Sequence, residues 1–308
     1  MQPEQSIDAV ARHIFQELWL TMENSEAGIK ENLEAECLHD FRIALRKNHV
    51  LLCQLKGVFP QQTIRRFKKE FHWLRGVSGP ARDLDVHMLS FNEFITCLSK
   101  KRKKHVDPLF IFLSNERKAE QLKLCEILDS RRYLRVLDDW KKFINESPQK
   151  RANLINANKS AILFANESIW HSYKKILVKG RQIKPDSAPD SLHALRKKCK
   201  NLRYLIEFFQ GMYPQRSIRH ILDSLKTLQN NLGEYQDLNV QVCFLKRSVI
   251  TLKRTNHDSE KSLKSMRILI EKLERRGQKV RQKFAKKFKK FSDNENNRLY
   301  TDLFKTKS

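Results

Sequence analysis

The sequence contains few residues that interrupt helices, because glycine and proline each occur only 8 times in 308 residues. No stretch alternates polar and apolar residues over the length of a strand, whereas Ile7, Val10, Ile14 and Leu18 recur at helical spacing. Apolar residues make up 40% of the chain, which is enough for one large core or two smaller ones. We therefore expect an all-α protein.

Signals for secretion, disulfides and membrane insertion are also missing. The 6 cysteines form no C-x-x-C pair. No stretch approaches the roughly 20 apolar residues that cross a bilayer. Residues 1–5 include an acid and a proline instead of a basic segment followed by an apolar one. These features predict a cytoplasmic protein with reduced thiols and no membrane span.

Motifs of catalysis are missing as well. The sequence has no glycine-rich loop of the kind that holds phosphates, no nucleophile motif and no cluster of carboxylates that would bind magnesium. We therefore expect neither an enzyme nor a cofactor.

Negative charge is scarce relative to positive charge. The chain carries 61 lysines and arginines against 35 acids, a formal net charge of +26. A small domain needs a net charge of only about 2 to 8 to stay soluble, so solubility alone does not account for this excess. Such a charge attracts anions strongly, and we expect a polyanionic partner.

The chain contains an internal repeat with an offset of 154 residues, half of its length. Between Leu38 and Val86, 14 of 49 positions are identical to the position 154 residues later, with no gap. The shared residues include the pairs His39 and His193, Arg42 and Arg196, and Asp83 and Asp237. The two repeats are expected to cover about 1–150 and 151–308, with a junction near 147–153.

Each repeat is expected to form a four-helix bundle. In the first repeat the helices are predicted at about 3–23, at 34–57, from 60 onward with an interruption near 76–80, and at 108–144. In the second repeat they are predicted at about 158–178, at 190–211, from 214 onward with an interruption near 230–234, and at 261–291. Polar linkers are expected at 24–33 and 179–189. The sequence does not decide whether the fourth helix of each repeat is continuous.

The second helix of each repeat separates apolar from basic residues onto neighbouring faces. Its basic stripe has the same spacing twice, and the third helix adds further cations. In the first repeat the candidate binding residues are His39, Arg42, Arg46 and His49, with Arg65, Lys69, His72 and Arg75. In the second repeat they are His193, Arg196, Lys200 and Arg203, with Arg219 and Lys226. Because like charges on one helical face repel, we expect an anion to compensate for them. Packing about a pseudo-two-fold axis would let these rows line a shared cleft or pore.

Three segments carry a resemblance to a known family: Leu38–Lys47 (LHDFRIALRK), Arg82–Val86 (RDLDV) and Leu192–Tyr204 (LHALRKKCKNLRY). They resemble the CHAD domain, the conserved-histidine α-helical domain, and the resemblance covers nearly the whole chain. It implies a single CHAD domain over 1–308, made of two four-helix bundles related by a pseudo-two-fold axis.

The resemblance also implies a function and further site residues. It implies a basic central surface or pore that binds inorganic polyphosphate, and a place at polyphosphate granules. It adds Lys47 and Lys197 to the basic positions. Two positions depart from the family pattern, since His49 and Gln236 stand where arginine is more usual. The alternating glutamates on strands that mark the triphosphate-tunnel hydrolase found beside many CHAD domains are absent, so a stand-alone domain is expected.

Two other functions fit parts of the sequence. A nucleic acid offers the same phosphate contacts, but reading single strands calls for exposed aromatic residues. The four tryptophans all fall on or beside apolar helical stripes, where core positions are expected. Metal chelation by His39 and His193 is disfavoured by the surrounding arginines and lysines, which would repel a cation.

Overall fold

The computed structural model describes residues 2–96, 98–146, 154–254 and 260–306. Within this part the only β pairing is a single antiparallel bridge between Ser6 and Ser160. The prediction of an all-α protein is therefore confirmed. The junction predicted at 147–153 lies outside the described residues, as does Cys97. The other five cysteines are free thiols.

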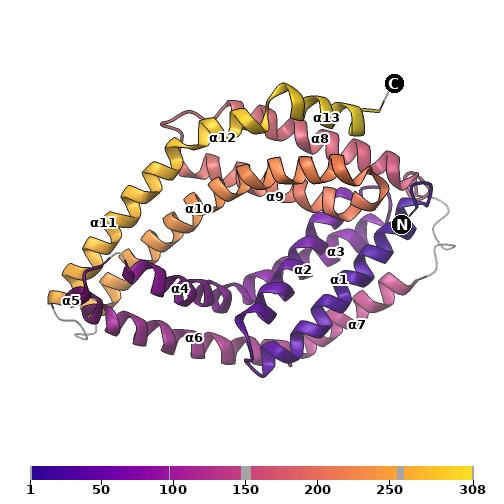
Figure 1. Cartoon of the computed structure of the whole chain (residues 1–308). Helices are drawn as coiled ribbons and strands as arrows, with labels where there is room; N and C mark the ends of the chain where they lie inside the picture. Colours follow the sequence, from indigo (N-terminus) through magenta and orange to yellow (C-terminus); the bar gives the residue numbers. More distant parts are fainter. Residues whose placement is uncertain (1, 97, 147–153, 255–259, 307–308) are drawn as a thin grey trace.

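The first half of the chain forms helices α1 to α7 and one 3₁₀ turn. These are α1 (Ile7–Lys30), α2 (Ala35–Gln54), α3 (Gln61–Val77), α4 (Gly79–Thr96), α5 (Lys100–Lys103), η1 (Lys104–Val106), α6 (Asp107–Leu128) and α7 (Arg131–Asn145). The second half forms α8 (Ala161–Arg181), α9 (Pro189–Phe209), η3 (Gln210–Met212), α10 (Gln215–Arg254), α11 (Glu260–Gln282), α12 (Phe284–Phe291) and α13 (Asn294–Phe304). In Figure 1 the first half runs along the lower side of an elongated molecule and the second half along the upper side.

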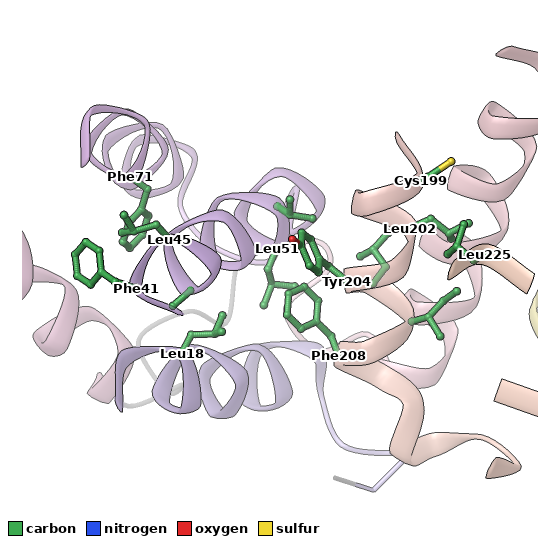
Figure 2. Close-up of a cluster of buried hydrophobic side chains, with 14 of the residues drawn as sticks. Leu18, Phe41, Leu45, Leu51, Phe71, Cys199, Leu202, Tyr204, Phe208 and Leu225 are labelled. Atoms are coloured by element: carbon green, nitrogen blue, oxygen red, sulfur yellow. The ribbon is translucent and has the colours of Figure 1, made fainter. Parts of the chain in front are cut away.

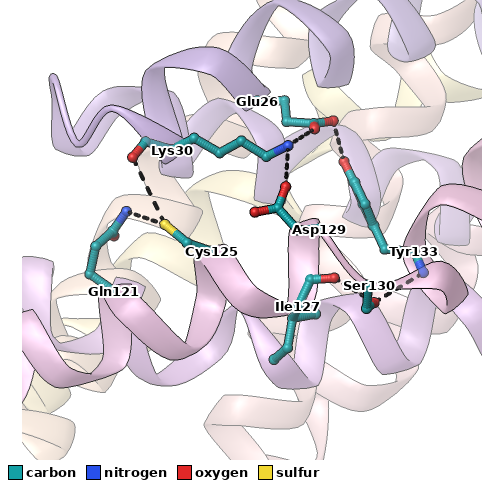
Figure 3. A network of polar contacts seen from close by, with 8 residues as sticks. All are labelled: Glu26, Lys30, Gln121, Cys125, Ile127, Asp129, Ser130 and Tyr133. Carbon is teal, nitrogen blue, oxygen red and sulfur yellow. Dashed lines mark hydrogen bonds and ion pairs between the residues drawn. The ribbon is translucent and has the colours of Figure 1, made fainter.

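Helix α1 is longer than predicted, because most of the expected linker at 24–33 is helical. Polar contacts fasten this extra turn to the α6–α7 connection (Figure 3). The Nζ of Lys30 lies 2.8 Å from carboxylate oxygens of both Glu26 and Asp129. The hydroxyl of Tyr133 donates to Glu26 at 2.7 Å. A sequence pattern cannot anticipate these partners, which lie about a hundred residues away.

Helix α10 is continuous, so the interruption predicted near 230–234 is wrong. In the first repeat the break between α3 and α4 holds Gly79 followed by Pro80, whose ring removes a backbone donor and favours the start of a new helix. The second repeat has Gly233 followed by Glu234, which keeps its donor. A lone glycine costs a helix only about 1 kcal/mol, so the helix runs through.

The predicted fourth helices are both divided. The first breaks at Asp129 and Ser130, where the Ser130 side chain caps α7. The second breaks at Lys283, and a further helix, α13, follows that was not predicted. Helices α12 and α13 are held by aromatic contacts, among them the stacked rings of Tyr173 and Tyr300 with centroids 3.7 Å apart.

The hydrophobic core continues from one half of the chain into the other. Figure 2 shows Leu45 and Leu51 of α2 on one side and Tyr204 and Phe208 of α9 on the other, with α2 and α9 packed together. All four side chains are buried. The apolar stripes predicted on the second helix of each repeat are confirmed as core, and they position the basic stripes beside the α2–α9 junction.

Two contacts join residues that lie 154 positions apart, the repeat offset. Ser6 pairs with Ser160. His87 of α4 meets Gln241 of α10, with 2.7 Å between Nδ1 and Oε1. These contacts bring equivalent positions of the two repeats together; the pseudo-two-fold arrangement stays a prediction.

We predict opposite effects for two glycine substitutions within helices. A Cβ on Gly180 would lie 2.0 to 2.7 Å from the buried ring of Phe288, so Gly180→Ala should lower the free energy of unfolding by about 1–3 kcal/mol. A Cβ on Gly277 has nothing within 4 Å, and Gly277→Ala should raise it by about 0.5–1 kcal/mol. Urea unfolding of both variants measures the difference, and equal effects would contradict the close approach of α8 and α12.

Candidate functional site

Six cations from the two repeats converge beside the α2–α9 junction. We call them the central cluster: Arg42 and Arg46 of α2, Arg75 of α3, and Arg196, Lys200 and Arg203 of α9. Electrostatic interactions link Arg46 to both Arg42 and Arg75, and Lys200 to Arg46, Arg196 and Arg203. Arg46 and Lys200 occupy equivalent positions 154 residues apart, so the basic stripes of the two repeats meet there.

A cavity of about 550 Å³ opens beside the second-repeat half of this cluster. Arg196, Lys200 and Arg203 line it from α9, and Gln229, Gly233 and Asp237 line it from α10. The chain has a larger cavity, of about 1130 Å³, but its walls mix acids and bases. Its charged lining residues are Asp83, Glu116, Glu120, Asp190, Glu271 and Glu274, together with Lys246, Arg247, Arg275 and Arg281. The smaller cavity also has three acids, Glu93, Glu234 and Asp237, but with Arg276 its four cations outnumber them, whereas acids outnumber cations in the larger one. An anion is therefore better accommodated in the smaller cavity.

The central cluster is held at an electrostatic cost. Burial and the neighbouring charges of Arg196 and Arg46 lower the pKa of Lys200 to about 7. Burial is also the main reason that the pKa of Arg42 is lowered to about 10 and that of Arg75 is lowered. Each shift shows that the site disfavours its own positive charge, so a bound anion would favour the charged forms of these side chains.

Equivalent arginines in the two repeats have equivalent surroundings. The guanidinium of Arg42 lies beside Gly79 and feels the charge of Asp83. Arg196 lies beside Gly233, with 3.7 Å between its Nη2 and a carboxylate oxygen of Asp237. The repeated Arg, Gly and Asp positions of the sequence thus come together in space.

Arg42 also has a structural role. Its Nη1 donates to the carbonyl of Arg75 and to the hydroxyl of Ser78, both at 2.7 Å, where α3 ends. In the second repeat, by contrast, Arg196 Nε and His193 Nδ1 are buried without a hydrogen-bond partner among the described residues. Unpaired buried polar atoms are uncommon in folded proteins, and Arg196 belongs to the central cluster.

The histidines of the stripes are less basic than free histidine. Burial is the main cause of the lowered pKa of His39 and His193, and it lowers the pKa of His49 to about 4. His49 therefore carries no charge at neutral pH. The charge at this end of the first repeat comes from Arg75, its neighbour on α3. In the second repeat the charged and neutral residues have changed places. Arg203 of α9 stands at the position of His49, Gln229 of α10 stands at the position of Arg75, and Arg203 donates to Gln229 at 3.4 Å.

The remaining candidate residues surround the cluster at different positions. Lys47 is paired with Glu207 at 3.2 Å and lies over the ring of Tyr204. Lys197 is exposed on α9. The candidate residues on α3 and α10 are exposed. On α3, helical spacing places Arg65, Lys69 and His72 on or beside the face of Arg75. On α10, it places Arg219 and Lys226 on the face of Gly233 and Asp237, which line the cavity. No contact among the described residues links Arg65, Lys69, Arg219 or Lys226 to the cluster.

The list of candidate binding residues left out four residues of the site. Arg82 raises the positive potential at His39 and Arg42, and donates to the carbonyl of Ala35. Gln229 and Gln241 line the cavity, and Arg276 of α11 closes one side of it by pairing with Glu234. The repeat could have revealed Arg82 and Gln229, because they align with Gln236 and Arg75.

The alternatives considered from the sequence have little structural support at this site. Trp19 and Trp140 are buried, and the half-buried Trp73 and Trp170 are covered by Arg132 and Lys174. The described residues contain no group of three or more histidine, cysteine or acidic residues placed to hold a metal ion. None of the helices in the described ranges is long and apolar enough to cross a membrane.

Comparison with known proteins identifies relatives of this arrangement. The family model of the CHAD domain matches residues 13–246. The fold is similar to a crystal structure of the CHAD domain from the plant Ricinus communis, with a TM-score of 0.76, 21% identity and 93% of each chain covered. It is also similar to PptA from Streptomyces chartreusis, with a TM-score of 0.69, 13% identity, and 92% of this chain and 99% of that chain covered. No curated protein matches the sequence.

Because the cations of the central cluster are partly buried and repel one another, we predict that removing one of them stabilises the ligand-free protein. Lys200→Met should raise the free energy of unfolding below pH 7 by on the order of 1–2 kcal/mol, since the side chain is only partly exposed and loses a disfavoured charge. Lys200 has a lowered pKa in the folded state, so the gain should shrink as the pH rises from about 7 towards 10.5, where the native lysine is already neutral.

Chemical unfolding at pH 6 and pH 9 measures this effect. The matched control is Lys197→Met, which removes an exposed lysine from the same helix and should change stability little. A loss of stability in Lys200→Met at pH 6 would contradict the claim that the charge of Lys200 destabilises the folded protein.

Proposed function

The chain belongs to the CHAD domain family, and from this premise we propose that it binds inorganic polyphosphate through the central cluster. The family is linked in general to polyphosphate-related ligands, and the CHAD domain by itself is not an enzymatic domain. We propose that residues 1–308 act as one such domain, that binding involves no catalysis, and that the protein works in the cytoplasm at polyphosphate granules.

The meeting of Arg46 and Lys200 is the observation that carries this proposal. Each lies at the middle of a basic stripe, and the two stripes come from different halves of the chain. Together they offer a continuous row of donors to a linear anion. Arginine and lysine make strong charge-assisted hydrogen bonds to phosphate oxygens, and polyphosphate presents such oxygens along its whole length.

Polyphosphate fits the site better than a nucleic acid does. Proteins that bind single strands combine basic grooves with aromatic side chains on which bases stack. The described residues that line the 550 Å³ cavity include no aromatic side chain. A ligand made only of phosphate groups needs none, so nucleic acid is the second candidate, bound through its backbone alone.

A competition experiment tests the choice of ligand. Long-chain polyphosphate should displace single-stranded RNA of matched charge at about 0.15 M salt, and its affinity should fall steeply as salt rises. The variant Arg46→Gln, Lys200→Gln, Arg203→Gln should bind polyphosphate about a hundred-fold more weakly, because three charge-assisted contacts are lost.

The control for this experiment removes three charges far from the site. Lys100, Lys101 and Lys104 are exposed around α5, at the end of the molecule opposite α8 in Figure 1. Their replacement by glutamine should change the affinity for polyphosphate less than about threefold, because these lysines act on the ligand only through the long-range field of the protein's net charge. Equal losses in both variants, or equal binding of RNA and polyphosphate, would overturn the proposed site.

The pKa of Lys200 predicts how binding depends on pH. A bound polyanion raises this pKa above about 7, so binding takes up a proton above pH 7, and affinity should fall as the pH rises from about 7 to 9. Lys200→Arg, which stays charged, should flatten this part of the profile. The lowered pKa values of His39 and His193 confine their contribution to lower pH. A profile identical in the wild type and in Lys200→Arg would exclude Lys200 from the binding site.

A further inference from the structure

A second basic surface lies on the other side of α9 from the central cluster. A groove of about 450 Å³ between α8 and α9 is lined by His171, Lys174, Lys175, Val178, Lys179, Gln182 and Lys198. We call it the outer lysine groove. Lys198 lies two positions from both Arg196 and Lys200, which places it on nearly the opposite face of α9.

The cations of this groove face one another without a counterion. No acidic residue lines the groove, and Lys174, Lys175, Lys179 and Lys198 form no ion pair with another described residue. After burial, Lys175 and Lys174 are the causes of the lowered pKa of His171, so these charges act on the same space. Lysines at neighbouring positions of one helical face repel, which favours an anion between them.

The lysines of the groove are not part of the pattern that the two repeats share. Helices α1 and α8 begin 154 residues apart, so their positions correspond directly. The residues equivalent to the four lysines carry no positive charge: Leu20 for Lys174, Thr21 for Lys175, Ser25 for Lys179 and Ala44 for Lys198. Only the second repeat has gathered lysines on this face.

The two basic surfaces are close enough for one chain to reach both. An α-helix with its side chains is about 10–12 Å across, and only α9 separates the surfaces. Lys197 is exposed on α9, between the face of Lys200 and the face of Lys198. A flexible polyanion that leaves the central cluster can therefore pass over Lys197 into the groove.

We propose that the outer lysine groove binds a second segment of the same polyphosphate chain that occupies the central cluster. This inference rests on the proposed function and adds a dependence on chain length. Once the central segment is bound, the outer segment is held at a high effective concentration, so the second contact adds affinity for long chains only. A short polyphosphate fills the central cluster and gains nothing from the groove.

Binding of two polyphosphates to two variants tests the proposal. The test variant replaces Lys174, Lys175, Lys179 and Lys198 by glutamine, which keeps helix propensity. The control replaces Lys100, Lys101, Arg102 and Lys104 by glutamine and removes the same charge around α5. The test variant should bind long-chain polyphosphate about ten-fold more weakly or worse, should bind tripolyphosphate as the wild type does, and should show a shallower salt dependence with the long chain only.

Each other outcome overturns the proposal in a recognisable way. If the test variant binds the long chain like the wild type, the groove does not take part. If the control loses as much affinity, only the general charge matters. If the test variant binds the long chain normally but loses binding to vesicles of anionic phospholipid, the groove serves a membrane surface. If the wild type binds neither polyphosphate, the proposed function itself fails, and this inference fails with it.

Discussion

The packing of α2 against α9 is the contact on which the rest of the site depends. It brings Arg46 and Lys200 together although like charges repel, and the lowered pKa of Lys200 records the cost. The apolar faces of the same two helices supply the opposing energy, since Leu51, Tyr204 and Phe208 are buried at the junction (Figure 2). Burial of each such side chain contributes roughly 1.5–3 kcal/mol, which is enough to hold a few cations at close range. The core and the site are thus two faces of one helix pair.

The two repeats keep the same charge by different means. In the first repeat the second helix offers a neutral histidine, His49, and the third helix a cation, Arg75. In the second repeat the cation is Arg203 on the second helix, and its partner Gln229 on the third is neutral. His49 looked like a weakened position in the sequence, but the structure indicates that the charge has moved to the neighbouring helix. Each repeat therefore has one arginine at this pair of positions, although Arg203 is also paired with Glu207 at 2.7 Å.

Local patterns in the sequence were sufficient to predict the helical fold, the core stripes and the basic stripes, because all three follow from a period of 3.6 residues. The repeat then related Arg42 to Arg196 and Asp83 to Asp237. What remained unpredicted depends on distant contacts. Lys30 extends α1 through Asp129, and Arg276 reaches the cavity from α11. The continuity of α10 was missed for a different reason, since one glycine alone does not end a helix that is packed along its length.

A receptor built from two repeats suits a ligand without direction. A nucleic acid strand differs when followed from one end or from the other, so two halves related by a two-fold axis would meet it in opposite senses. A chain of identical phosphates is the same in both directions. In the proposed complex, the stripes that meet at Arg46 and Lys200 would contact such a chain in the same way whichever direction it runs. The contact between His87 and Gln241, also 154 residues apart, brings equivalent positions of α4 and α10 together. The outer lysine groove, which has no basic counterpart in the first repeat, would then distinguish one end of the proposed binding path from the other.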